Sequence, residues 1–267
     1  MIRRIALPLA TIAALTALAC VDMSAPSGAA SISALLLPSP SVVVGDTMRD
    51  STGAVAALRV IAYDANNTPI SGLATSFFVT DTAKIAHIAN SSFLVGDKQG
   101  SIHVIGQVTG VQTVPVPVPV TVAPTTFALA GTIPDTIFGT IAGDTTQSIS
   151  NQAIGVTLKG KGDTAVVSFV VKYDLKYAPA TKPGSATPAV FIGADASKAS
   201  PVDTTDASGS ASRSIIARSF LLADQQLAAG QKTDSLVLLI STSYKGVLVG
   251  GSPLRVVRPF KVKLSIQ

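Results

Sequence analysis

The chain has 267 residues, of which 47% are hydrophobic and 5% aromatic, and its 20 basic and 15 acidic residues give a net charge of +5. This charge is mild and spread along the sequence without clusters of Lys or Arg among aromatic residues, which argues against a nucleic-acid-binding surface. All fifteen acidic residues are Asp. Asp prefers turns and caps to helix interiors, so the composition favours strands and loops.

The first twenty residues predict an export signal. Arg3 and Arg4 precede the apolar run Ile5–Ala19, which is shorter than the roughly 20 residues of a membrane-spanning helix. The run ends at Cys20, the only cysteine in the chain. Residues 17–20 resemble a bacterial lipoprotein signal, which implies that Cys20 is acylated and serves as the lipid anchor. The alternative is an ordinary secretory signal with an incidental cysteine.

Both interpretations predict an exported protein. Val21 follows the cysteine, where an Asp would favour retention at the inner membrane, so an outer-membrane or cell-surface location is expected. Loss of Arg3 and Arg4 leaves 18 basic and 15 acidic residues, a charge of +3. Because Cys20 is the only cysteine, the chain cannot form an internal disulfide, and the stability of the fold must come from the burial of apolar side chains. The length allows one large core or two ordinary ones, and we expect two.

Residues 21–31 are small, polar and rich in Pro and Gly, as expected of a flexible tether between anchor and fold. Residues 32–44 contain short apolar runs separated by Pro38 and Pro40, which disfavour a helix and indicate a kinked edge strand. The strand would close on a turn at Gly45-Asp46.

The segment Leu58–Ile88 has the pattern strand, polar turn, strand, short strand. Its turn, residues 64–69, reads DANNTP, where Asn, Asp and Pro favour a tight reversal. Residues 75–80 (TSFFVT) have strand composition. Together with Val44-Gly45-Asp46-Thr47 and residues 78–86 (FVTDTAKIA), this segment resembles the group 2 bacterial immunoglobulin-like domains of invasin- and intimin-type surface proteins. The resemblance implies a β-sandwich, and the family has no shared enzyme activity.

Residues 114–122 read VPVPVPVTV, with Pro at every second position. Alternate residues of a strand direct their N–H groups to opposite neighbours, so the missing donors all lie on one edge. We therefore expect an edge strand that pairs on one side only, with the prolines blocking association of the other edge. A free polyproline-like spacer is the alternative. Two further short strands, 91–95 and 101–108, are expected before this segment.

A domain boundary is predicted near residues 123–126, dividing the chain into one sandwich over 32–123 and a second over 125–267. Short strand-like segments separated by turns predict the second sandwich. One short helix is expected at Leu221–Ala229, before Gly230. Residues 178–200 form a loop-rich insertion suited to variable function. The eight strand-like segments are 127–133, 136–141, 152–158, 165–173, 189–193, 211–219, 236–243 and 255–266.

Candidate chemistry is sparse. His87 and His103 are the only histidines, and we expect strand residues rather than a zinc site, because neither Cys nor Glu accompanies them. The Asp-rich segments 64–67 and 203–206 lack the spacing of a calcium loop and are expected to form turns. No Gly-x-Ser-x-Gly nucleophile motif is present. The four tyrosines are possible ligand contacts but are expected to pack in the core or at its rim: Tyr63, Tyr173, Tyr177 and Tyr244.

The sequence thus predicts an all-β protein of two immunoglobulin-like sandwiches in tandem, after a signal peptide and a short tether. We expect no catalytic, cofactor-binding or metal site. The leading hypothesis is a non-enzymatic protein, attached to the membrane through Cys20, that serves adhesion, envelope scaffolding or spacing, with a protein or polysaccharide partner. The alternative is a carbohydrate-binding or hydrolase-accessory module that uses the 178–200 loop. A hydrolase would require Asp residues clustered around a histidine.

Overall fold

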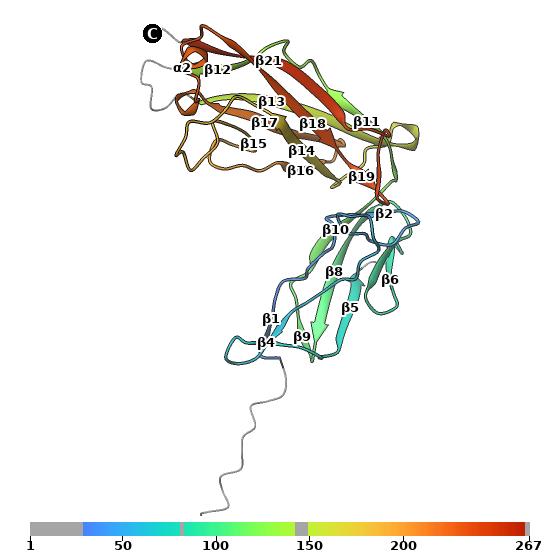
Figure 1. Cartoon of the computed structure of the whole chain (residues 1–267). Coiled ribbons are helices and arrows are strands. Elements are labelled where there is room, and N and C mark those ends of the chain that lie inside the picture. Colours follow the sequence, from blue (N-terminus) through green and yellow to red (C-terminus); the bar gives the residue numbers. More distant parts are fainter. Residues whose placement is uncertain (1–28, 81–82, 142–148, 265–267) are drawn as a thin grey trace, which may run out of the picture.

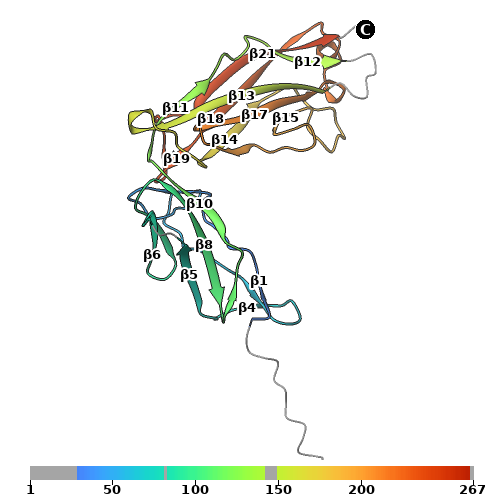
Figure 2. The ribbon, with the colours of Figure 1, turned by 180° about the vertical axis from the view of Figure 1, so that it is seen from behind.

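The computed structural model describes residues 29–80, 83–141 and 149–264, so the predicted signal, Cys20 and most of the predicted tether lie outside the described residues. The fold is all-β, and two immunoglobulin-like sandwiches lie end to end (Figure 1). Figure 2 shows the same arrangement from behind. Each sandwich has its own cluster of buried apolar side chains. The prediction of two cores in an all-β chain is therefore confirmed.

The first sandwich has a main sheet in the order β2-β10-β8-β5, with β9 paired to β8. A three-stranded sheet, β1-β3-β4, and the hairpin β6-β7 complete it. Its core contains the fully buried side chains of Met48, Leu94 and Ile102. The strands are β1 Ser31–Ile32, β2 Val42–Val43, β3 Ala62–Tyr63, β4 Pro69–Ile70, β5 Thr75–Thr80, β6 Ala86–Ala89, β7 Phe93–Gly96, β8 Gly100–Val108, β9 Val111–Gln112 and β10 Val116–Thr121.

The second sandwich packs the sheet β11-β13-β17-β15 against the sheet β12-β21-β18-β14-β16. The hairpin β19-β20 extends towards the first sandwich (Figure 1). The strands are β11 Pro124–Ala130, β12 Ile137–Ile141, β13 Ile149–Gly160, β14 Val170–Tyr177, β15 Val190–Gly193, β16 Val202–Thr204, β17 Ser210–Arg218, β18 Thr233–Ser241, β19 Ser243–Tyr244, β20 Val247–Leu248 and β21 Leu254–Leu264. Two 3₁₀ turns, η1 Lys161–Asp163 and η2 Ser219–Leu221, and the helix α2 Gln225–Ala228 complete it.

Each of the eight segments predicted for the second sandwich overlaps an observed strand, although 165–173 overlaps β14 only from Val170 onwards. The strands β16, β19 and β20 were missed because each is only two or three residues long. The expected helix is shorter than predicted. It starts after Asp224, whose carboxylate accepts hydrogen bonds from the amides of Gln226 and Leu227 as an N-cap. It ends before Gly230, which has a φ of +75°. None of the helices in the described part of the chain has the length and hydrophobicity needed to cross a membrane.

Several predictions for the first sandwich need correction. The single kinked strand expected over residues 32–44 is divided between the end of β1 and the separate strand β2. The expected strand at Leu58–Tyr63 is regular only at β3, because residues 58–61 bond irregularly to residues 33–36 and to the Ser92 carbonyl. The predicted tether extends too far, because the Ala30 amide already bonds to the Tyr63 carbonyl and Ser31 begins β1. By contrast, β5 has the predicted bounds and the 64–68 turn forms as expected.

The valine–proline segment is a strand, β10, but it is not at the edge of its sheet. It pairs antiparallel with β8 along Val116–Val120 and parallel with β2 at Val120 and Thr121. The second pairing begins only after Pro119, the last proline of the series, where N–H donors are available on both sides again. The prediction that the strand pairs on one side only is thus confirmed for its proline-bearing part. It is wrong for the end of the strand, because nothing in the local sequence indicates a partner about 80 residues earlier.

Tyr173 of β14 is buried at 1% exposure in the second core, and its hydroxyl has no hydrogen-bond partner among the described residues. Burying a hydroxyl without a hydrogen-bond partner lowers the free energy of unfolding, so removing the hydroxyl should recover that loss. We expect Tyr173→Phe to leave the free energy of unfolding unchanged or to raise it by up to about 1 kcal/mol. Urea unfolding measures this. A loss of more than about 1 kcal/mol would mean that the hydroxyl is satisfied, for example by a buried water.

Candidate functional site

The junction between the sandwiches is the most polar buried region of the described structure. Among seven buried polar residues, Ser41, Asp46, Thr121 and Thr242 all lie at this junction. Buried polar groups are costly unless they are paired. Their presence here indicates specific contacts between the sandwiches rather than a loose connection, and their bonding partners bear this out.

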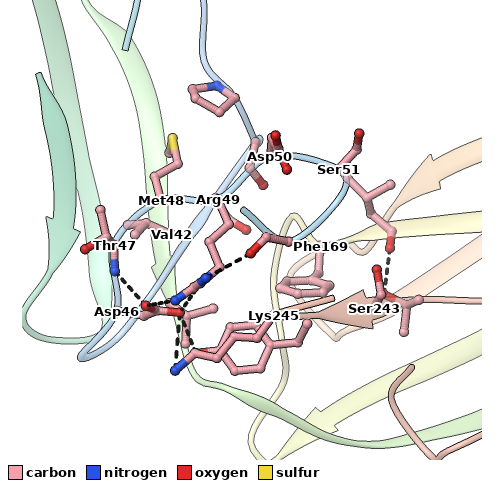
Figure 3. Close-up of a pocket in the computed structure, with 18 of the residues that line it drawn as sticks. Val42, Asp46, Thr47, Met48, Arg49, Asp50, Ser51, Phe169, Ser243 and Lys245 are labelled. Atoms are coloured by element: carbon pink, nitrogen blue, oxygen red, sulfur yellow. Dashed lines mark hydrogen bonds and ion pairs between the residues drawn. The ribbon is translucent and has the colours of Figure 1, made fainter. Parts of the chain in front are cut away.

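Asp46 is the centre of the junction (Figure 3). The Arg49 guanidinium donates to both oxygens of its carboxylate, at 2.8 and 3.0 Å, and the Thr47 amide donates at 2.9 Å. From the second sandwich, the Tyr244 hydroxyl donates to Asp46 Oδ2 at 2.8 Å. Lys245 Nζ lies 3.7 Å from the same oxygen. One buried carboxylate therefore holds groups from both sandwiches.

The electrostatics favour an ionised Asp46 and a neutral Tyr244. Burial alone would raise the pKa of Asp46, but the hydrogen bonds from Arg49, Tyr244 and the Thr47 amide outweigh it and hold this pKa below its usual value. Burial and the bond to Asp46 raise the pKa of Tyr244. The phenol thus stays protonated and donates to a carboxylate, the charge-assisted type of hydrogen bond that is stronger than a neutral one.

The connection between the sandwiches is also short and packed. Only Val122 and Ala123 separate β10 from β11. Val122 packs against the second core, and its side chain fills the space beside Gly160, where an added Cβ would meet it at 2.5 Å. Thr121 Oγ1 accepts from the Val167 amide at 2.9 Å. A two-residue link held in this way leaves little freedom for one sandwich to swing against the other.

Two further contacts bring loops of the first sandwich onto the second. The Ser41 hydroxyl donates to the Ser168 carbonyl at 2.9 Å. The turn at Gly53 lies directly on the tip of the β19-β20 hairpin, so that a Cβ built on Gly53 would lie 2.1 Å from the Gly246 amide nitrogen. Both glycines have positive φ angles, +90° and +77°, which glycine adopts without strain. The contact therefore requires glycine at this turn.

A cavity of about 210 Å³ lies beside Asp46 within this junction (Figure 3). Its walls carry the hydroxyls of Ser39, Ser41 and Ser243 and the rings of Phe169 and Tyr244. No histidine is among the described residues that line it, and its charged side chains are those of Asp46, Arg49, Asp50, Lys172 and Lys245. Asp46 is bonded to Arg49 and Tyr244. The arrangement is suited to holding the two domains together.

The histidines do not form a site with these groups. His87 lies on β6 and its Nδ1 is 2.7 Å from Asp97 Oδ2, but both side chains are exposed, at 55% and 38%. His103 is exposed on β8. Within the described residues there is no group of three or more metal-ligating side chains. A single exposed pair lacks the cluster of carboxylates that a hydrolase would need.

The Asp-rich segment 64–67 forms a turn, as predicted, whereas 203–206 belongs to strand β16 up to Thr204 and its turn begins only at Asp206. Asp64 accepts from the amides of Asn66 and Thr68, and Asp206 accepts from those of Ser208 and Ser210. Asp203 instead pairs with Arg213 at 2.9 Å. Each of these carboxylates already bonds within the chain.

The four tyrosines have different positions. Tyr173 is in the core, Tyr63 is half-buried on β3, and Tyr244 is at the junction. Tyr177 is 50% exposed at the end of β14, beside the 178–200 insertion, and its hydroxyl bonds to Asp234 at 3.2 Å. No local pattern indicates the Asp46–Tyr244 contact, because 198 residues separate the partners.

No protein-family model and no curated protein matches the chain. Solved structures do. Domains 4 and 5 of the S-layer protein SbsC match at 13% identity and a TM-score of 0.31, over 88% of this chain and 99% of that one. The Yersinia pseudotuberculosis adhesin InvE matches at 17% identity and a TM-score of 0.33, over 86% of this chain and 58% of that one. Invasin, a bacterial integrin-binding protein, matches at 14% identity and a TM-score of 0.29, over 87% of this chain and 40% of that one. The chain thus spans less than two thirds of InvE and of invasin, and nothing about its partners follows from these likenesses.

Proposed function

We propose that this chain is an exported, lipid-anchored, non-enzymatic protein of the cell surface or periplasm, in which two sandwiches form a rigid spacer for adhesion or envelope scaffolding. The observation that carries the proposal is the junction: a buried carboxylate bonded from both sandwiches and a two-residue link. Such a junction fixes the distance between the two ends of the molecule, which is the property that a spacer needs.

The positions of the ends support the same proposal. β1 begins at the end of the first sandwich that is remote from the junction, and α2 lies at the far end of the second (Figures 1 and 2). With an anchor at Cys20 and a tether over residues 21–29, the second sandwich would be held away from the membrane. We propose the domain limits 32–123 and 125–267 on the same basis, with Ala30 and Ser31 added to the first sandwich because they pair with Tyr63.

The anchor is tested by the intact mass of the membrane-extracted protein, beside a Cys20→Ser variant. We expect the mass of residues 21–267 plus an acylated cysteine, and a variant that is not acylated and is not retained in the membrane fraction. A soluble product without lipid from the unmodified sequence would contradict the anchored spacer. It would leave the geometry of the junction unaffected.

A carbohydrate-binding or hydrolase-accessory role is the second candidate, and the exposure of the Tyr177 ring beside the 178–200 insertion favours it. Exposed tyrosine rings offer an apolar face with a polar edge, as sugar rings require. A glycan array tests this role, and saturable binding that is lost in Tyr177→Ala would support it.

A further inference from the structure

Basic residues that are scattered in the sequence lie together on the outer face of the sheet β12-β21-β18-β14-β16. In β21, Val256, Phe260 and Val262 point into the core, so Arg255, Lys261 and Lys263 point outward. In β14, Val171 and Tyr173 are buried and Lys172 alternates with them. Asp174 and Lys176 also lie on this strand and pair with each other. The outward side chains of these two strands therefore carry five cations and one carboxylate, and Asp234, whose carboxylate accepts from the Tyr177 hydroxyl at the edge of the face, brings the local charge to +3.

This local charge equals that of the molecule as a whole. Without Arg3 and Arg4 the chain carries +3, so everything outside the face sums to zero. The outer face of the opposite sheet is built mainly of Ala, Ser and Thr, and its charged members among the described side chains are Lys159 and Arg218. Arg218 stacks over the Phe191 ring at 4.9 Å. The positive face is thus a property of one sheet and not of the whole surface.

The register of the strands places an apolar strip between the charges. Val237 of β18 lies opposite Val257 of β21 on one side and Tyr177 of β14 on the other. Val257 is 38% exposed and Tyr177 50%. Towards the junction Arg255 lies beside Leu239, and at the far end Lys261 lies beside Thr233. At about 3.4 Å per residue, Arg255 and Lys261 are about 20 Å apart along β21.

We propose that this face binds a linear acidic polysaccharide. A single small anion cannot contact cations about 20 Å apart, whereas a polymer with repeated carboxylate, phosphate or sulfate groups can. The apolar strip and the Tyr177 ring suit the apolar faces of sugar rings. The face is less suited to single-stranded nucleic acid, which stacks its bases on aromatic rings. The Tyr177 residue is 50% exposed and its ring can stack on a ligand. The Phe138 ring is covered by Lys263 Nζ, which lies 3.7 Å from the ring centroid, so it is not open for stacking. This inference goes beyond the spacer function and does not depend on the anchor.

The test is binding of the purified full chain to immobilised dextran sulfate and polygalacturonate, with neutral dextran as reference. The variant Arg255→Ala/Lys261→Ala/Lys263→Ala removes three cations of the face. A matched control, Lys98→Ala/Lys161→Ala/Lys198→Ala, removes three exposed cations elsewhere and gives the same net charge. We expect saturable, salt-sensitive binding of both polyanions, weakened about ten-fold or more in the face variant and less than about two-fold in the control.

Three outcomes would overturn the proposal: equal losses in the two triple variants, no binding of either polyanion at low salt, or tighter binding to phosphatidylglycerol vesicles or to oligo-dT than to either polysaccharide. Tyr177→Ala should weaken polysaccharide binding at unchanged net charge. The charge-preserving variant Arg255→Lys/Lys261→Arg/Lys263→Arg should retain binding, which guards against a variant that simply misfolds.

Discussion

Arg213→Met should lower the free energy of unfolding of the second sandwich by about 3–5 kcal/mol, because it leaves a largely buried carboxylate without its counter-ion and, among the described residues, bonded only to the Ser212 amide. Arg213 of β17 and Asp203 of β16 are 16% and 19% exposed, and their side chains meet at 2.9 Å. The guanidinium also donates to the Ser200 and Val202 carbonyls. Since β16 and β17 belong to different sheets, this one side chain links the two layers beside the edge strand β16.

Urea unfolding followed by tyrosine fluorescence measures this effect, since three of the four tyrosines lie in the second sandwich and the chain has no Trp. The matched control is Lys176→Met. Lys176 and Asp174 form an ion pair whose side chains are both more than half exposed, and this pair should contribute less than about 1 kcal/mol to the free energy of unfolding. Adding Asp203→Asn to Arg213→Met should recover part of the loss, because the buried charge is removed. Equal, small losses in Arg213→Met and Lys176→Met would contradict the interpretation.

Gly53→Ala should open the junction without unfolding either sandwich. The new Cβ would lie 2.1 Å from the Gly246 amide nitrogen and 2.7 Å from Lys245 backbone, so the hairpin tip must move away and the Asp46–Tyr244 bond must lengthen. The positive φ adds a local cost of about 1 kcal/mol or more in the first sandwich. We expect a wider range of distances between the sandwiches, measured between spin labels.

Gly72→Ala is the control for that strain. Gly72 also has a positive φ, +80°, and also lies in a turn of the first sandwich, but nothing lies within 4 Å of its added Cβ. We expect this variant to lower the stability of the first sandwich by a similar amount and to leave the distances between sandwiches unchanged. A junction equally affected by both substitutions would show that strain, and not the contact with the hairpin, controls it.

Strand content and many strand limits were predictable because each depends on local pattern. Strand composition, rich in aromatic and β-branched residues, predicted β5 at its observed bounds, and alternating valines predicted that β10 is a strand. The parallel pairing of β10 with β2 was not predictable. It joins residues about 80 positions apart, and short apolar runs carry no information about their partners.

The junction and the positive face could not be predicted for the same reason. Asp46 was noted only as part of a turn, and its partner Tyr244 was expected to pack in the core or at its rim. The basic residues look scattered in sequence, because Lys172 and Arg255 come from strands 83 residues apart in the chain. Only the sheet order, which puts β14 and β21 on either side of β18, places their side chains on one face.

The rigidity of the junction is tested most directly by the distance between two spin labels, one on each sandwich. The chain allows clean labelling, since Cys20 is its only cysteine and can be replaced by Ser. Ser101 on β8 and Ser235 on β18 are exposed positions for new cysteines. We predict one distance distribution, as narrow as that between labels at Ser76 and Ser101 within the first sandwich. A distribution as broad as that of Gly53→Ala would contradict a rigid spacer.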